Sequence, residues 1–336
     1  MRLLECLSGK SVDRIPFVPA VYEHKAFLIG ETPSAICRDA SLLVKALKAE
    51  YEIYKADLLV VGVDVYNVEA EALGAAVKYF TTNETPVISK PLLDNPKEIC
   101  RLKLPNPRYS GRMPLLLSAG REISRELEKQ VPIWGAITGP FSLAAQLVGV
   151  TKLLLTVRRE PGSVCTMLDF TTRVAFEFAK GWRDAGLGVV IFDSFCAPPL
   201  VSPSVYFELI FPYHAQLMEL LRDLGLEHRP LIIGGNTTSI ARYLMCTGTT
   251  FVICDYNADK EVFIQEADKA GIAVRMNVDP LLVYNGPEEA ITKAGEEIVK
   301  MRKRISKVIL GTGVLPYATP PTHVLALKKC AGMWAP

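Results

Sequence analysis

The sequence has no Cys-x-x-Cys pair, no long unbroken apolar run, and no basic stripe with aromatic residues between its charges. Its eight cysteines are scattered, which is typical of reduced core thiols in a chain of this size. Because a membrane helix needs about 18 or more consecutive apolar residues, we expect no membrane partner. The missing basic stripe argues against nucleic acid as a partner. The first residues form no signal-peptide pattern, so we expect a cytoplasmic location.

The charges of the chain are nearly balanced, with 38 basic and 36 acidic side chains and a net charge of +2. So small an excess creates no overall field that would steer acidic partners. The chain has 336 residues, of which 49% are hydrophobic and 22% charged, as in an ordinary globular protein. Single α/β barrels often reach this length, so one domain is sufficient.

Eight short apolar runs recur along the chain, and each is followed by sequence with helical periodicity. They cover residues 17–21, 58–63, 132–137, 187–192, 230–233, 250–254, 272–276 and 308–310. Such runs predict strands buried on both faces, and their alternation with helices predicts a parallel sheet. Eight repeats predict an α/β fold of the (β/α)8 TIM barrel type, formed by residues 1–336 as a single domain. Residues 81–114 are rich in proline and polar side chains and are predicted as an irregular excursion over the barrel rim.

A doubly wound open sheet is the alternative architecture for this pattern. That fold usually carries a Gly-rich nucleotide-binding turn after its first strand. No such turn follows residues 17–21. The closed barrel is therefore favoured.

Polar side chains follow most of the predicted strands, at the end where barrel enzymes build their active sites. They include no arginine; His24 is their only basic member, and Lys25 follows it in the chain. Carboxylates and amides recognise ligand edges that mix hydrogen-bond donors and acceptors, such as those of pterins, purines and guanidines. A cap or turn role is the alternative for each member taken singly. The set comprises Glu23, His24, Asp64, Asn67, Glu69, Thr138, Asp193, Ser194, Asn236, Asp255, Asn257, Asn277 and Asp279.

These polar residues do not form a recognisable metal site. Zinc requires three or four converging His, Cys or carboxylate ligands. Of the four histidines, only His24 stands at a predicted strand end, and His214 lies within a helical pattern where packing is the simpler role. Cys254 lies beside Asp255, but alternation along a strand turns it away from the barrel interior. We therefore predict no metal.

Several short motifs follow one another along the chain as they do in the uroporphyrinogen decarboxylase superfamily, which the sequence therefore resembles. The stretch Val68-Glu69-Ala70-Glu71-Ala72-Leu73-Gly74 is most similar to its corrinoid-dependent methyltransferase branch. The resemblance covers nearly the whole chain and implies a (β/α)8 barrel. The further motifs that carry it are Gly139-Pro140-Phe141, Asp193-Ser194, Gly235-Asn236-Thr237, Asn277-Val278-Asp279-Pro280, Gly286-Pro287-Glu288-Glu289, Gly311-Thr312-Gly313 and Thr319-Pro320.

The sequence departs from the decarboxylases of this superfamily near its N-terminus. Those enzymes bind a polycarboxylate substrate with an Arg-Gln-Ala-Gly-Arg segment. The corresponding segment here, residues 20–25, has no arginine pair, and its Glu23 would repel carboxylates. Porphyrinogen decarboxylation is therefore not expected.

A second departure concerns zinc. The thiol methyltransferases of the superfamily hold zinc with a His-x-Cys motif and a later Cys, and these positions correspond here to Ile232, Gly234 and Val314. Zinc holds the thiol acceptor as a reactive thiolate. An acceptor that is nucleophilic without a metal is therefore expected, and N5 of tetrahydrofolate satisfies that condition.

The resemblance implies methyl transfer from methylcobalamin, carried by a separate corrinoid protein that docks over the barrel mouth, to N5 of tetrahydrofolate without zinc. Alternatives are a corrinoid-dependent methyltransferase with another acceptor or donor, such as a thiol, an aromatic ether or a methylamine, and a non-catalytic ligand-binding barrel. The predicted catalytic residues are Glu69, Asp193 and Asn236, with Glu69 or Asp193 accepting the N5 proton. The predicted substrate-binding residues are Asn67, Thr138, Ser194, Asp255, Asn257 and Asn277.

Overall fold

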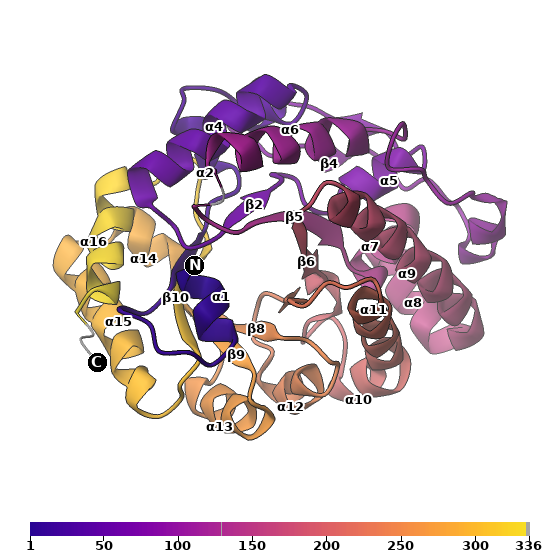
Figure 1. The fold of residues 1–336 in the computed structure, drawn as a ribbon. Helices are drawn as coiled ribbons and strands as arrows, with labels where there is room; N and C mark the ends of the chain where they lie inside the picture. Colours follow the sequence, from indigo (N-terminus) through magenta and orange to yellow (C-terminus); the bar gives the residue numbers. More distant parts are fainter. Residues whose placement is uncertain (129, 334–336) are drawn as a thin grey trace.

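The computed structural model describes residues 1–128 and 130–333. Lys129 and residues 334–336, which the predicted domain 1–336 includes, lie outside the described residues. One sheet holds eight strands in the order β1-β10-β9-β8-β7-β6-β5-β2, and its neighbouring strands pair in parallel. The sheet curls into a nearly closed ring with helices around its outside (Figure 1). The predicted (β/α)8 barrel is thereby confirmed.

The secondary structure alternates between short strands and longer helices. The strands are β1 Phe17–Ala20, β2 Leu59–Val61, β3 Val77–Lys78, β4 Val87–Ile88, β5 Ile133–Thr138, β6 Gly188–Phe192, β7 Leu231–Ile232, β8 Phe251–Cys254, β9 Ala273–Val278 and β10 Val308–Val314. The α-helices are α1 Arg2–Leu7, α2 His24–Phe27, α3 Pro33–Ile36, α4 Ala40–Tyr54, α5 Val68–Ala72, α6 Met113–Glu126, α7 Pro140–Val148, α8 Val150–Arg159, α9 Pro161–Asp184, α10 Pro203–Val205, α11 Phe211–Asp223, α12 Ala241–Met245, α13 Lys260–Ala270, α14 Pro280–Asn285, α15 Glu288–Lys300 and α16 Pro321–Ala331. Short helical turns are η1 Pro96–Arg101, η2 Ser194–Cys196, η3 Tyr206–Ile210, η4 Thr238–Ile240 and η5 Met301–Lys303.

Each barrel strand overlaps a predicted apolar run, although the boundaries differ. Strand β10 continues beyond residue 310 to Val314, whereas β7 consists of Leu231–Ile232 only. The antiparallel hairpin of β3 and β4 has no counterpart in the sequence prediction, because strands of two residues show no periodicity. Strand β4 and the turn η1 both belong to segment 81–114.

The inside of the barrel is closed at one end by α1. Leu3 and Leu7 of α1 belong to the same buried cluster as Trp134 of β5 and Ile309 of β10. Helix α1 lies across the ring of strands in Figure 1, and Cys6 donates from Sγ to the carbonyl oxygen of Val308, where β10 begins. The amino ends of the strands are therefore covered, and the carboxyl ends remain for a site.

The gap between β1 and β2, the two ends of the strand order, is bridged by polar side chains. Near the amino ends, Phe17 and Asp57 exchange hydrogen bonds, with the Asp57 carboxylate accepting from the Phe17 N–H at 2.7 Å. Near the carboxyl ends, Lys25 donates from Nζ to the carbonyl oxygens of Val60 at 2.9 Å and Gly62 at 3.3 Å. Lys25 thus serves barrel closure, a role that its place near a strand end did not indicate.

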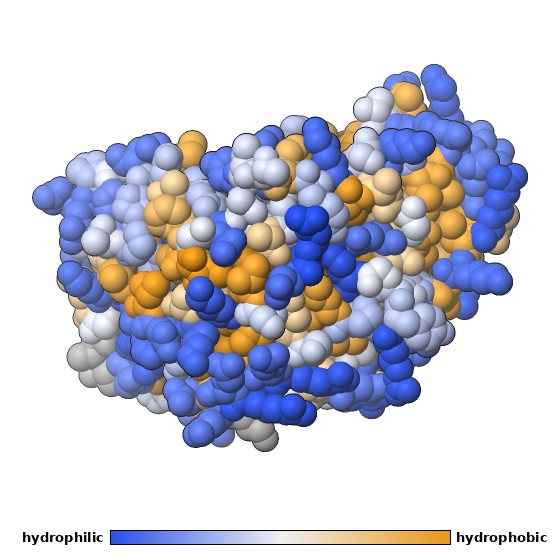
Figure 2. Space-filling model, turned by 90° about the horizontal axis from the view of Figure 1, so that it is seen from above, coloured by the Kyte–Doolittle hydropathy of each residue, from blue (hydrophilic) through white to orange (hydrophobic). Residues whose placement is uncertain are grey.

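Figure 2 looks onto the side of the molecule where α4 and α6 lie at the top of Figure 1. Hydrophilic side chains there surround separate apolar patches (Figure 2). Within the described ranges, no single helix is long and apolar enough to cross a membrane. Helices α7 and α8, which meet at a bend of 109°, pass that test of length and composition only as a pair.

Candidate functional site

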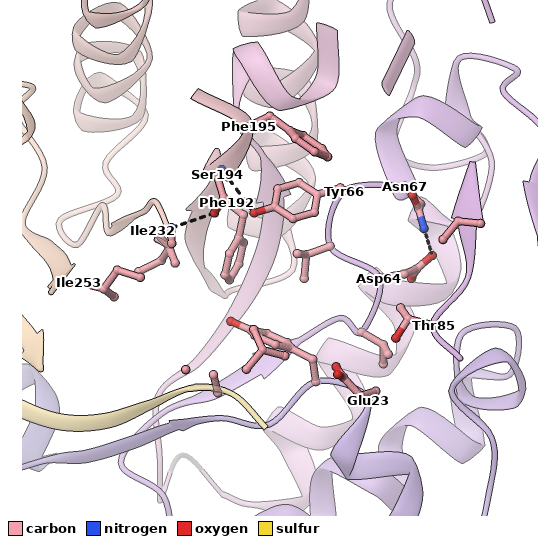
Figure 3. Close-up of a pocket in the computed structure, with 18 of the residues that line it drawn as sticks. Glu23, Asp64, Tyr66, Asn67, Thr85, Phe192, Ser194, Phe195, Ile232 and Ile253 are labelled. Atoms are coloured by element: carbon pink, nitrogen blue, oxygen red, sulfur yellow. Dashed lines mark hydrogen bonds between the residues drawn. The ribbon is translucent and has the colours of Figure 1, made fainter. Parts of the chain in front are cut away.

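A cavity of about 450 Å³ opens at the carboxyl ends of the barrel strands (Figure 3). Its walls come from the carboxyl ends of β1, β6, β7, β8, β9 and β10 and from the turns after β1, β2, β6, β7 and β8. Gln146 of α7 and the β3–β4 hairpin (residues 77–88, the rim hairpin) complete them. A volume of this size accommodates a small organic ligand, and the carboxyl end is where barrel enzymes place their chemistry. The lining includes four of the predicted site residues, Asn67, Ser194, Asp255 and Asn277.

The other predicted site residues lie elsewhere. Glu69, Thr138 and Asp193 are buried behind the wall and do not line the cavity. Asn236 and Asn257 are exposed outside it, and Asn236 accepts a hydrogen bond from the Thr238 N–H. The four lining residues therefore remain the candidates for ligand binding, and the predicted catalytic set is not assembled at this cavity.

Asp255 and Asn277 form one hydrogen-bonded unit at the ends of β8 and β9. The Asp255 carboxylate accepts from Asn277 Nδ2 at 3.0 Å and from the Gly235 N–H at 2.8 Å. Arg275 donates from Nε to Asn277 Oδ1 at 3.0 Å. The carboxylate is therefore held by fixed donors and orients the amide that faces the cavity.

Arg275 is a cation in the cavity wall that the sequence analysis missed. It is 5% exposed, and its burial lowers the pKa of the guanidinium. Gly311 of β10 leaves the space for it, because a Cβ there would lie 2.6 Å from Arg275 Cδ. The signal was its spacing from Asn277, since residues two apart on a strand face the same side. The cavity is consequently not the arginine-free ring that was predicted.

Asp64 is tied to the start of α6. Its carboxylate accepts from Arg112 at 3.0 and 2.6 Å and from Asn67 Nδ2 at 3.2 Å. The Asn67 amide also donates to the carbonyl oxygen of Pro86 at 2.6 Å, which fixes the rim hairpin beside the cavity. Thr85 and the residues after it, up to Ile88, therefore form part of the wall although they come from segment 81–114.

Four aromatic side chains line the cavity wall, and none of them was in the predicted site. Tyr22 meets Phe192 edge-on with ring centroids 5.7 Å apart, and Tyr66 packs on Phe195 at 5.5 Å. Burial raises the pKa of Tyr66 to about 12, so its hydroxyl stays neutral at physiological pH. Flat apolar walls with a few fixed polar groups suit a planar heterocycle.

Glu69 forms a buried pair with Thr138 behind the wall. Its two oxygens lie 2.6 Å from the Thr138 N–H and from Thr138 Oγ1, and that hydroxyl is also 2.8 Å from the carbonyl oxygen of Val65. The threonine has one hydroxyl proton, so both contacts are satisfied when a protonated Glu69 donates to it. Burial raises the pKa of Glu69 to about 7, which agrees with this arrangement.

Glu69→Gln is expected to remove part of the pH dependence of stability. A carboxyl whose folded pKa is raised from 4.5 to about 7 binds its proton more tightly in the folded state. Its contribution is complete below pH 4.5 and is lost as the pH rises to about 7. Relative to the variant, the wild type should lose on the order of 2–3 kcal/mol of unfolding free energy over this range.

Urea unfolding of both proteins between pH 4.5 and 8 measures this difference. Burial also raises the pKa of Glu50 to about 7, but that group is common to both proteins and cancels. A difference that stays constant with pH would show that Glu69 is ionised throughout.

Asp193 anchors the start of α7. Its carboxylate accepts from the N–H groups of Phe141 at 3.1 Å and Ser142 at 2.6 Å, and from His214 Nε2 at 2.8 Å. The other ring nitrogen of His214 lies 3.0 Å from the hydroxyl of Tyr206. His214, predicted as a packing residue, is therefore a buried hydrogen-bonding partner.

One cluster has the composition of a metal site. The ligand atoms of Asp193, Cys196 and His214 lie within 4.8 Å of one another, and all three residues are buried. However, both Asp193 oxygens already accept hydrogen bonds, and burial raises the pKa of the Cys196 thiol well above its usual value. A thiol must lose its proton to bind a metal, so this cluster fits a structural hydrogen-bonding role.

The three positions that the resemblance matches to zinc ligands of the thiol methyltransferases line the cavity. Ile232, Gly234 and Val314 belong to its lining. A Cβ at Gly234 would have no neighbour closer than Ser194 Oγ at 3.5 Å and Asp255 Oδ2 at 3.6 Å. Space for a side chain exists there, but an isoleucine, a glycine and a valine supply no side-chain donor atom for zinc.

Comparison with known proteins supports the resemblance. The MtbA methylcobamide:CoM methyltransferase of Methanosarcina acetivorans is 25% identical over 339 residues, covering 98% of this chain and 96% of that protein. The uroporphyrinogen decarboxylase of Xylella fastidiosa is 26% identical over 358 residues, with the same coverage of 98% and 96%. A methyltransferase structure from Methanosarcina mazei shares the fold, with a TM-score of 0.85, 21% identity, and coverage of 99% of this chain and 97% of that chain.

The family model for uroporphyrinogen decarboxylase (URO-D) matches residues 1–334. That match spans all of the barrel strands and every turn that lines the cavity. The chain therefore belongs to the uroporphyrinogen decarboxylase (URO-D) family.

Proposed function

We propose that this protein transfers a methyl group from a methylated corrinoid, carried by a separate corrinoid protein, to N5 of tetrahydrofolate without zinc. The observation that carries the proposal is the cavity wall at Ile232, Gly234 and Val314. These residues cannot hold the zinc that would activate a thiol, so the acceptor must be nucleophilic on its own. The nitrogen lone pair of a weakly basic amine meets this requirement.

The similarity to a methylcobamide:CoM methyltransferase supports a corrinoid as the methyl donor. Val87 and Val314 line the cavity and are 46% and 49% exposed. Tyr256 follows β8 and Leu281 follows β9, with exposures of 40% and 59%. Exposed apolar side chains around an opening are suited to contact with a partner protein, here the corrinoid protein.

The cavity also has features that suit a pterin. Its aromatic walls can cover the faces of a planar ring. Around the edge, Ser194 offers its hydroxyl, and Asn67 and Asn277 each keep a lone pair on Oδ1 beside the hydrogen bonds that they already form. The buried guanidinium of Arg275 can donate to a carbonyl oxygen of the ligand, whereas it would repel a positively charged group of the ligand. Asn67, Ser194, Asp255 and Asn277 are therefore the residues to which we assign substrate binding.

Methyl transfer needs little from the protein beyond placement. The N5 lone pair forms the new N–C bond while the Co–C bond breaks, and both electrons of that bond remain on cobalt. The proton of N5 then leaves to water or to a carboxylate. Because both reactants are already activated, the chain contributes by holding N5 in line with the methyl group and by excluding water.

The decisive experiment offers the purified protein free methylcobalamin and different acceptors. We expect methylation of tetrahydrofolate, at a rate that strong chelators leave unchanged, and little methylation of coenzyme M or homocysteine. Product formation is followed by chromatography and by the absorbance change of the corrinoid. Faster methylation of either thiol under the same conditions would overturn the proposal.

A further inference from the structure

Glu23 contributes a carboxylate to the cavity wall. It lines the cavity and forms no hydrogen bond or ion pair through its side chain with any other residue that the structure describes. Burial raises the pKa of its carboxyl. In Figure 3 it lies on the same side of the cavity as Asp64 and Thr85, away from Ser194 and Ile232, and no dashed line reaches it.

The other carboxylates at this end of the barrel are occupied. Asp64 binds Arg112 and Asn67, and Asp255 binds Asn277 and the Gly235 N–H. Their oxygens therefore have less capacity for a ligand, because each accepted bond uses a lone pair. Within the part of the chain that the structure describes, Glu23 is the cavity carboxylate that bonds no other residue; a hydrogen bond from its own backbone N–H leaves lone pairs on its oxygens for a ligand.

The backbone of Glu23 is held in place by its two successors in the chain. His24 lies 2.6 Å through Nε2 from the hydroxyl of Tyr54 and 2.8 Å through Nδ1 from the carbonyl oxygen of Tyr317. Lys25 donates to carbonyl oxygens in β2 and just after it, and lies 3.4 Å from a Glu50 oxygen. Both side chains are fully buried. The carboxylate is thus presented from a rigid turn, which lowers the entropy cost of binding a ligand.

We propose that Glu23 is the residue that recognises the pterin, by accepting two parallel hydrogen bonds from the ring N3–H and the exocyclic 2-amino group. The assignment rests on the proposed function, because it names the contact by which that site selects its acceptor. Two parallel N–H donors match the two oxygens of one carboxylate, and such charge-assisted bidentate pairs are strong and directional. A ligand carboxylate or sulfonate at this position would instead be repelled.

Binding calorimetry under anaerobic conditions tests the contact with two proteins and two ligands. The ligands are tetrahydrofolate and its analogue in which hydrogen replaces the 2-amino group. Glu23→Gln should weaken tetrahydrofolate binding about 10-fold or more, because one acceptor oxygen becomes an NH₂ that faces the amine. Removing the amine should cost the wild type a similar factor. The variant should distinguish the two ligands far less than the wild type does.

Glu31→Gln is the matched control, since Glu31 lies in the same segment but outside the cavity lining. It should bind both ligands as the wild type does. If Glu23→Gln binds tetrahydrofolate with wild-type affinity, or weakens both ligands equally, Glu23 does not read the amino group. In that case a wild type that still methylates tetrahydrofolate leaves the proposed function intact. A wild type that binds neither ligand overturns both proposals.

Discussion

Asp193→Ala is expected to lower the free energy of unfolding by about 3–5 kcal/mol. This is the usual range when a buried charged group is removed and its partners are left behind. The substitution leaves three buried donors unpaired, namely the N–H groups of Phe141 and Ser142 and the Nε2–H of His214. It also removes a negative charge from the N-terminus of α7, where the helix dipole favours it. Thermal and urea unfolding measure the loss.

A second helix-capping aspartate, Asp279, serves as a control that distinguishes the effect of burial from the effect of helix capping alone. Asp279 caps α14 by accepting from the Leu281 N–H at 2.8 Å, but it does so at the surface. Asp279→Ala should therefore cost only about 1 kcal/mol. Below the unfolding transition, Asp193→Ala should retain most of the wild-type affinity for tetrahydrofolate, because the residue does not line the cavity. Normal stability with lost folate binding would instead support the catalytic role that the sequence analysis assigned to Asp193.

The fold could be predicted because its strands carry strong local signals. Runs such as residues 187–192 are apolar throughout, and the eight repeats left few topologies to consider. The hairpin of β3 and β4 gave no such signal, because its order depends on contacts such as Asn67 with the carbonyl oxygen of Pro86. The Thr85–Ile88 wall could not be foreseen from the sequence, since it is created by the tertiary structure.

The site was only partly predictable, because the end of a strand does not determine which side a residue faces. Phe192 lines the cavity, so its neighbour Asp193 points outward into the helix layer. The same alternation places Arg275 and Asn277 together on the inner side. Applying the two-residue period to each strand end would have moved Asp193 outward and brought Arg275 in. The sequence could not show that the Glu23 carboxylate bonds no other residue, because this depends on which partners all of its neighbours bind.

Gly135→Ala is expected to be among the most damaging single-methyl additions in the chain. Gly135 lies in β5, and a Cβ there would be 2.0 Å from Cδ2 and Cε2 of Trp182. Trp182 is fully buried in α9 and packs on Phe178, so its ring has no free space into which to move. Overpacking usually costs 1–3 kcal/mol, and so deep an overlap with a fixed indole should cost at least about 3 kcal/mol.

Gly162→Ala provides the control, because Gly162 belongs to the same helix as Trp182 and a Cβ there meets nothing within 4 Å. That change should leave the melting temperature unchanged or raise it, since alanine is the better helix former. A smaller ring at position 182 should relieve the clash, so Gly135→Ala combined with Trp182→Phe should lose less stability than the two single changes added together. If the two stability losses simply added, the methyl group introduced at Gly135 and the indole of Trp182 would not collide. The distance between β5 and α9 would then be larger than in this structure.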